Sequence, residues 1–174
     1  QPYLMTSHDQ GRSFGPPHAI GHTRQDVMTL VHLATFGDGT LAVTTQVADP
    51  QMRVKSFVRF STDGGATLSA PTLVTDQNQN VHDAFPITRR DGNVDLYYLR
   101  EAGAGFEAWR RMVKKDGTLG PEQRLTGPDI GSVEKPQPRR LADGSLSVNV
   151  ARRRPDAQSF DVVAFRLDGD APAA

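Results

Sequence analysis

The chain has 174 residues, 37% of them hydrophobic, with 16 glycines, 12 prolines and no cysteine. Its 20 basic and 20 acidic side chains balance, so it lacks the basic excess expected of a nucleic-acid binder, and the missing cysteines exclude disulfides and thiolate metal sites. Abundant glycine and proline favour short strands joined by tight turns over a helical bundle, and no apolar run is long enough to span a membrane.

Strands are predicted in groups of four along the chain. In the first group, Leu41 and Val43 alternate with Ala42 and Thr44, which is the period-two pattern of a strand with one buried face. No segment shows sustained helical periodicity. The predicted strands lie near residues 28–36, 40–47, 55–61 and 71–75, then 84–89, 93–100, 107–114 and 122–126, and finally 136–141, 145–152 and 160–167.

Two series of turns recur with one period. Asp-Gly pairs that begin at Asp38, Asp91 and Asp143 are spaced by 53 and 52 residues, and each is predicted to close a hairpin because its turn needs positive φ angles. A second series has aspartates at positions 9, 63, 116 and 168, spaced by 54, 53 and 52 residues. Two interleaved series with one period indicate a structural repeat.

The predicted fold is all-β and consists of β-propeller blades of four antiparallel strands, because four strands in about fifty residues are the size of such a blade. Residues 1–174 are predicted to form a single propeller region, in which 1–20 end one blade, 27–75 and 81–126 form two blades, and 135–168 form an incomplete one. These are about three blades, whereas closed propellers have about four to eight. The chain is therefore expected to belong to a larger ring, of six-bladed type, completed by other blades of the same protein or by further copies of this chain.

Two turns of the second series carry a longer motif. Ser7 to Phe14 reads Ser-x-Asp-x-Gly-x-Ser-aromatic, and Ser61 to Leu68 matches apart from its last residue. The chain thereby resembles the Asp-box, or bacterial neuraminidase repeat, propellers of the sialidase-like superfamily. In such a hairpin a carboxylate and a hydroxyl accept hydrogen bonds from backbone N–H groups, and the aromatic residue is expected to pack between neighbouring sheets. The residues predicted to have this structural role are Ser7, Asp9, Gly11, Phe14, Ser61, Asp63, Gly65 and Thr67.

Candidate site residues come from the repeat itself. Function in propellers is expected where the inner strands enter the central funnel, and the second and third inner strands begin near His82, Asp83 and Glu134. Nine residues after their Asp-Gly pairs, Arg100 and Arg152 occupy equivalent positions. Because arginine forks bind carboxylates in bidentate fashion, the predicted substrate-binding residues are Arg152, Arg100 and His82. Asp83 is a candidate acid/base catalyst on geometry alone.

The stretch from Gly131 to Arg152 resembles a sialidase segment that carries a functional glutamate, a hairpin and then an arginine. The resemblance implies that Glu134 is catalytic, by polarising a tyrosine nucleophile, and that Arg152 grips the carboxylate of the substrate. The alternative is a solvated strand end whose charges pair with one another. The family's other arginines, its acid/base aspartate and its tyrosine nucleophile have no recognisable counterpart, and Tyr97 and Tyr98 lie on a predicted strand, where packing is expected.

The sequence therefore predicts a sialidase-like propeller segment that recognises a glycan ligand and, in a complete ring, hydrolyses glycans such as terminal sialosides. The alternative is a non-enzymatic propeller, a lectin or a protein-interaction scaffold, which the missing motifs favour. No cofactor or metal site is predicted, because Pro16, Pro17 and Gly21 argue against the helix that would bring His18 and His22 together. The resemblance implies an extracellular, periplasmic or cell-surface location.

Overall fold

The computed structural model describes residues 3–20, 27–49, 51, 53–75, 79–127, 129–154 and 159–167, and for residues 27–29 only the backbone. His22 and the predicted turn at Asp168 lie outside this part of the chain. Every regular element among the described residues is a strand, and none is a helix that could cross a membrane. The strands are β1 (Tyr3–Leu4), β2 (His18–Ala19), β3 (Val27–Thr35), β4 (Leu41–Ala48), β5 (Val54–Ser61), β6 (Thr72–Leu73), β7 (Val81–Thr88), β8 (Val94–Ala102), β9 (Gly105–Val113), β10 (Gln123–Arg124), β11 (Val133–Arg140), β12 (Leu146–Arg153) and β13 (Phe160–Leu167).

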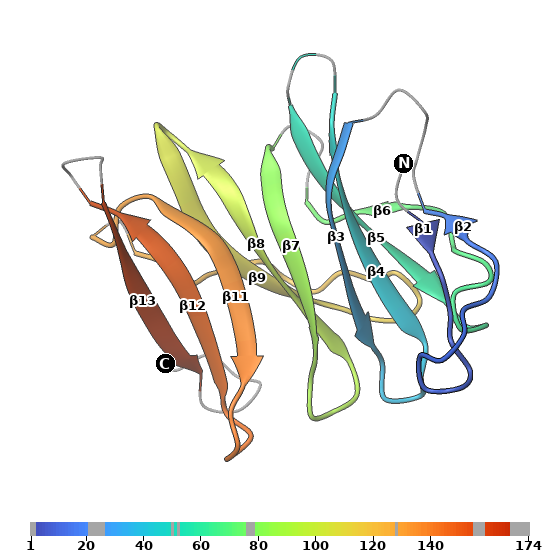
Figure 1. Ribbon diagram of the computed structural model, residues 1–174. Coiled ribbons are helices and arrows are strands. Elements are labelled where there is room, and N and C mark those ends of the chain that lie inside the picture. Colours follow the sequence, from blue (N-terminus) through green and yellow to red (C-terminus); the bar gives the residue numbers. More distant parts are fainter. Residues whose placement is uncertain are drawn as a thin grey trace.

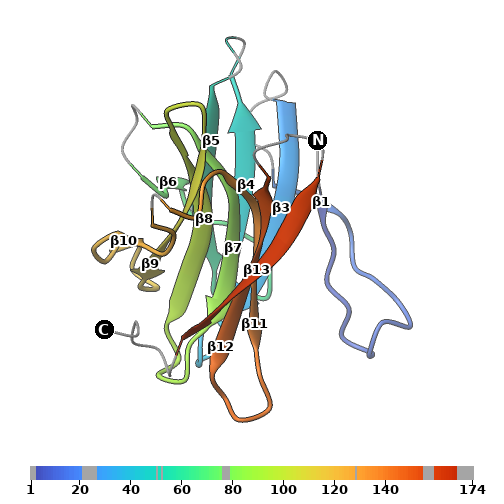
Figure 2. The same cartoon turned by 90° about the vertical axis from the view of Figure 1, so that its left-hand side faces the viewer.

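These strands form four antiparallel sheets, which confirms the predicted all-β fold. One sheet is the pair β1–β2, two have four strands (β3 to β6 and β7 to β10), and the last has three (β11 to β13). The larger sheets stand side by side as propeller blades (Figure 1), and their inner strands β3, β7 and β11 contact one another in that order. Seen from the side, the outer strands β6, β9 and β10 lie at the opposite edge of the blades from β3 (Figure 2).

The second and third inner strands begin earlier than their alternation pattern predicted and close to the starts that the repeat assigned, near His82 and Glu134. They start at Val81 and Val133, whereas the alternation pattern placed their starts at 84 and 136. In both strands the register shifts soon after the start, between His82 and Phe85 and between Glu134 and Gln137. A β-bulge of this kind breaks the period-two pattern, so the residues before it do not read as part of the same strand. The first inner strand has a bulge at the corresponding place.

Two hydrophobic cores join the three blades. The core between the first and second blades includes Phe36, Val58 and Tyr98, and the core between the second and third includes Tyr97 and Leu146. Adjacent residues of a strand point to opposite faces of the sheet, so the two tyrosines enter different cores. Both are fully buried, which confirms their predicted packing role.

The first Ser-x-Asp-x-Gly hairpin satisfies its own backbone groups. Ser7 Oγ donates to Asp9 Oδ1 (2.8 Å) and accepts the N–H of Gly11 (2.7 Å). Asp9 in turn accepts the backbone N–H and the hydroxyl of Ser13, at 2.8 and 2.6 Å. Gly11 has a φ of 86°, the left-handed conformation that glycine adopts without steric penalty.

The second hairpin repeats this pattern. Ser61 Oγ donates to Asp63 and accepts from the N–H of Gly65, both at 2.7 Å. Asp63 accepts the N–H and hydroxyl of Thr67, at 2.9 and 2.6 Å. Gly65 has a φ of 97° and lies directly against the Leu4 side chain, so the β1–β2 segment packs on this hairpin.

Phe14 does not pack between sheets as expected. Its side chain is 58% exposed. The segment between β1 and β2 that carries it projects away from the larger sheets (Figure 2).

The far face of the third blade is open. In the first two blades the corresponding faces of the second and third strands lie against the next blade, and Ala42, Val58, Tyr97 and Ala108 on them are fully buried. In the third blade, Val162 on the equivalent face is 78% exposed. The described part of the chain therefore ends in a blade without a neighbour on that side.

Candidate functional site

The bulges of the inner strands place two residues in an unusual backbone conformation. Asp83 in β7 has a φ of 53°, and Lys135 in β11 has a φ of 51°. Left-handed conformations are uncommon for residues other than glycine, and aspartate is among those that tolerate them best. Such conformations persist where the surroundings hold them, and they concentrate at functional sites. The bulges thus set His82, Asp83 and Glu134 apart from the rest of the inner strands.

Side chains of the preceding blade hold the bulge at Asp83. Gln46, which extends from β4 and is 7% exposed, accepts the backbone N–H of Asp83 with its Oε1 atom at 2.7 Å. Thr44, two residues earlier on the same strand, donates its hydroxyl to the carbonyl oxygen of Ala84 at 2.6 Å. The neighbouring blade therefore satisfies polar backbone groups that the bulge removes from the ladder.

Two half-buried histidines flank Asp83, and each contacts an aromatic ring. The ring of His82 meets Phe106 of β9 edge-on, with the centroids 4.9 Å apart. The ring of His32, on β3, lies 3.8 Å from that of Phe85. Three titratable side chains from two blades thus gather near the start of β7.

Burial controls the protonation of these three groups. Burial raises the pKa of Asp83 above its ordinary value, and repulsion from the Glu134 carboxylate adds to the increase, although His82 and Lys135 oppose it. Burial also lowers the pKa of His82 and of His32, more strongly than the negative charge of Asp83 raises it. Burial therefore shifts the carboxyl group and both imidazoles toward their uncharged forms.

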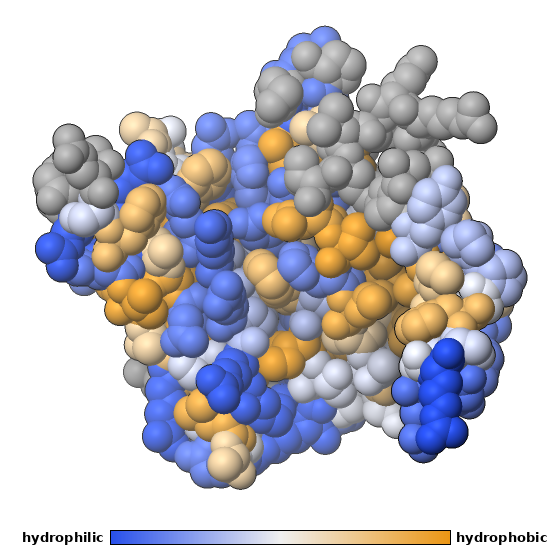
Figure 3. All heavy atoms as spheres, viewed as in Figure 1, coloured by the Kyte–Doolittle hydropathy of each residue, from blue (hydrophilic) through white to orange (hydrophobic). Residues whose placement is uncertain are grey.

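Glu134 lies at the corresponding bulge of the next inner strand. Its Oε1 atom pairs with Arg153 of β12 at 2.9 Å, and Arg153 also lies over the Phe160 ring. Because Glu134 acts electrostatically on Asp83, the two predicted catalytic carboxyl groups belong to one neighbourhood. Hydrophilic residues cover β11 on the face of the inner strands, whereas hydrophobic residues gather over β3 (Figure 3).

Arg152 is not the arginine that pairs with Glu134. It binds Asp161 of β13 at 2.6 Å, and Arg154 binds the same carboxylate. Successive residues on a strand point to opposite faces, so Arg152 and Arg153 cannot both reach Glu134. Nothing in the residue types distinguishes the two positions, and only the register of β11 and β12 decides between them.

Arg100 is directed toward the outer strands. Its guanidinium pairs with Glu122 at 3.1 Å and lies 4.2 Å from the centre of the Trp109 ring. The hydroxyl of Tyr98 donates to the same glutamate at 2.6 Å. The structure therefore places Asp83 next to His82, with Glu134 within electrostatic range of Asp83, and engages Arg100 and Arg152 within their own blades.

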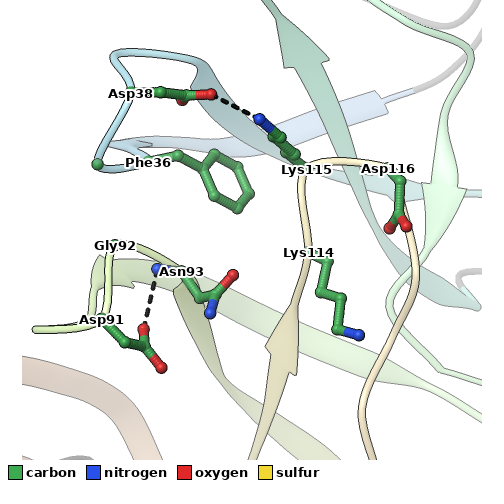
Figure 4. A pocket seen from close by; sticks show the side chains of 9 residues that line it. Phe36, Asp38, Asp91, Gly92, Asn93, Lys114, Lys115 and Asp116 are labelled. Atoms are coloured by element: carbon green, nitrogen blue, oxygen red, sulfur yellow. Dashed lines mark hydrogen bonds and ion pairs between the residues drawn. The ribbon is translucent and has the colours of Figure 1, made fainter.

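Of the cavities lined by described residues, two lie at opposite ends of the blades. One, of about 390 Å³, adjoins the site through Phe106, which contacts His82, and the ion pair of Glu107 and Arg124 also lines it. The other, of about 440 Å³, lies between the hairpins that follow β3 and β7, where Asp38 pairs with Lys115 (Figure 4). Among the described residues no group of three or more potential ligands could hold a metal ion.

No protein-family model matches the chain, and no curated protein matches its sequence. Solved structures match its fold. A protein of unknown function from Dyadobacter fermentans has a TM-score of 0.72 at 17% identity, over 97% of this chain and 48% of that one. A Hadza microbial sialidase has a TM-score of 0.65 at 17% identity, over 94% of this chain and 37% of the other. An endo-arabinase from Bacteroides thetaiotaomicron has a TM-score of 0.58 at 12% identity, over 88% and 62%.

These similarities concern the fold. The chain resembles propellers of glycoside hydrolases and of a sialidase, and it spans from 37% to 62% of the length of these three matched chains. It therefore corresponds to part of a larger propeller.

Sequence reasoning missed Gln46, His32 and Arg153. One signal for Gln46 exists in the repeat, because the corresponding positions of the next two blades carry Leu99 and Ala151. A polar residue where its counterparts are apolar, facing the next blade, is the pattern that could have identified it. His32 and Arg153 were not identified, because only the packing of strands brings their partners Phe85 and Glu134 to them.

Proposed function

We propose that this chain is the part of a glycan-handling propeller that carries a pair of catalytic carboxyl groups, Asp83 and Glu134. The observation that supports this most is the buried Asp83, held in a left-handed bulge near the Glu134 carboxylate. Carboxyl groups whose environments differ in this way are typical of glycosidic bond hydrolysis. The similarity to sialidase and endo-arabinase propellers supports the same class of substrate.

In this proposal the two carboxyl groups have different roles. Protonated Asp83 gives its proton to the glycosidic oxygen as the bond from that oxygen to the anomeric carbon breaks. The Glu134 carboxylate stabilises the positive charge that develops on the sugar ring, and water then adds to the anomeric carbon and returns a proton to Asp83. His82 borders this position and is assigned to substrate binding.

Terminal sialosides are the substrates that would use Arg152, and Arg100 at the corresponding position of the second blade, to grip a carboxylate. Both arginines have carboxylate partners in their own blades, so a sialoside would have to displace Asp161 or Glu122. Neutral glycans do not require this exchange. The proposed substrate class is therefore a glycan, with a sialoside and an arabinoside as the two compounds to compare. A glycan-handling role fits an extracellular, periplasmic or cell-surface location, which belongs to the same proposal.

A non-enzymatic glycan-binding propeller is the second candidate. The observation that favours it is the complete burial of Tyr97 and Tyr98, which removes them as nucleophiles. Hydrolysis by carboxyl groups alone does not need a tyrosine, so turnover separates the two candidates directly.

The test is hydrolysis of 4-methylumbelliferyl sialoside and 4-methylumbelliferyl arabinofuranoside by the purified protein, together with binding to a glycan array. Asp83→Asn and Glu134→Gln should each lower turnover by about 100-fold or more, since each removes an acid/base or charge-stabilising group. Asp116→Asn, in a hairpin at the opposite end of the blades, is the matched control. Saturable glycan binding without turnover would establish the lectin. The absence of both binding and turnover would refute a glycan role.

We further propose that another blade covers the open face of the third blade. The repeat supports this, because the equivalent faces of the first two blades are buried against their neighbours. The occupant is a blade of the same kind, from the same protein or from a further copy of this chain.

A further inference from the structure

The bulge at Asp83 is held by three polar side chains of the first blade. Gln46 accepts the N–H of Asp83, and Thr44 donates to the carbonyl of Ala84. Ser56, which lies opposite Gln46 on β5, donates its hydroxyl to the carbonyl of Val81 at 3.0 Å. These bonds fix the backbone immediately before, at and after the bulge.

The second blade makes the same bulge in its neighbour without such side chains. The positions that correspond to Thr44, Gln46 and Ser56 by strand register are Tyr97, Leu99 and Ala108. Leucine and alanine offer no side-chain hydrogen bond, and among the described residues the Tyr97 hydroxyl interacts with Arg110 and not with the backbone of β11. The φ of Lys135 is nevertheless 51°, against 53° for Asp83. The fold therefore does not need these polar groups to form the bulge.

We infer that Gln46 is a positioning residue that fixes the orientation of Asp83. This inference rests on the proposed function in so far as Asp83 acts on a glycan. A backbone held only by sterics can rotate about φ and carry the carboxyl group with it. The buried amide of Gln46 removes this freedom, because rotation would leave its Oε1 atom and the N–H of Asp83 without partners. The carboxyl group of Asp83 thus keeps one direction between His32 and His82.

Gln46→Met is the principal variant, because it keeps the volume and removes the acceptor. Leu99→Met, at the corresponding position of the second blade, is its matched control. We expect Gln46→Met to accelerate hydrogen exchange of the Asp83 amide at least tenfold and to change the NMR titration of His82. Turnover should fall at least tenfold with an unchanged KM, because the substrate still binds while the acid is misplaced. Leu99→Met should leave the exchange of the Asp83 amide unchanged.

Gln46→Glu is the conservative variant, and it provides the test if Gln46→Met does not fold. It retains an acceptor for the Asp83 N–H, so protection of that amide should persist. Its added negative charge should raise the pKa of Asp83 and shift the alkaline limb of the pH profile to higher pH, because Asp83 acts in its protonated form. Unchanged Asp83 exchange and His82 titration in folded Gln46→Met would overturn the inference. Both measurements need no glycan, so they remain decisive even if no glycan is bound or hydrolysed.

Discussion

Asp83 and Lys135 have the same backbone conformation at corresponding bulges of successive inner strands, with φ angles of 53° and 51°. The side chains at the two positions have opposite charge, so the conformation belongs to the blade and not to the residue. A repeated bulge places different chemical groups at the same point of successive strands. This relationship makes Lys135 a reference site for effects of the bulge alone.

Lys135 allows the strain of the bulge to be measured apart from function. Lys135→Gly should change the free energy of unfolding by less than about 0.5 kcal/mol, because glycine adopts positive φ freely. Lys135→Val should lower it by about 1–2 kcal/mol, because a β-branched residue clashes there. Urea unfolding of both variants measures the difference. Equal stability of the two variants would show that the bulge relaxes.

Asp95 is a buried charge in the second blade and should be sensitive to substitution. The residue is 1% exposed, and its carboxylate pairs with Arg89 at 3.2 Å and with Arg110 at 3.7 Å. Asp95→Asn would remove the buried counter-charge that the two arginines share, and a loss of about 3–5 kcal/mol of unfolding free energy is expected. Asp91→Asn removes an exposed partner of Arg89 and should cost less than about 1 kcal/mol. Urea titration compares the two, and similar losses would contradict this assignment.

The two Ser-x-Asp-x-Gly hairpins should make the stability of the fold depend on pH in the acidic range. Hydrogen bonds from Ser13 and Ser7 lower the pKa of Asp9 to about 2, and those from Thr67 and Ser61 lower the pKa of Asp63 further. A carboxylate with a depressed pKa in the folded state stabilises the fold above the unfolded value, near 4, and this contribution is lost as pH falls toward the folded value.

Melting temperatures between pH 6 and pH 2 test this dependence. Asp63→Asn should flatten the decline below pH 4, whereas Asp129→Asn should not. Parallel curves for Asp63→Asn and the unaltered protein would rule out the hairpin as the source.

Val162 tests the blade that is proposed to cover the third one. If a further blade packs there, Val162→Lys should lower the unfolding free energy by more than about 1.5 kcal/mol or reduce the native mass of the purified protein, because the ammonium would be buried. Ala142→Lys, on an exposed hairpin of the same blade, is the control. If Val162→Lys changes neither the free energy of unfolding nor the native mass, this face is open to solvent.

The sequence by itself determined the repeat, the hairpins and the strands. Asp-Gly pairs and alternating residues act over a few positions, so local chemistry was sufficient to place strands such as 40–47 and 145–152 within a residue of their observed bounds. The hydrogen bonds of Asp9 and Asp63 are equally local, since each joins residues two to four positions apart.

Only the tertiary structure decided what surrounds the site. Gln46 and Asp83 are 37 positions apart and meet because two blades stack, and Arg153 faces Glu134 because register sets which side of the strand it occupies. The bulges near the start of β7 and β11 interrupt the alternation, so only the repeat, and not the residue pattern, pointed to the first residues of both strands. Contacts between sheets depend on packing and register, which no local pattern of residues specifies.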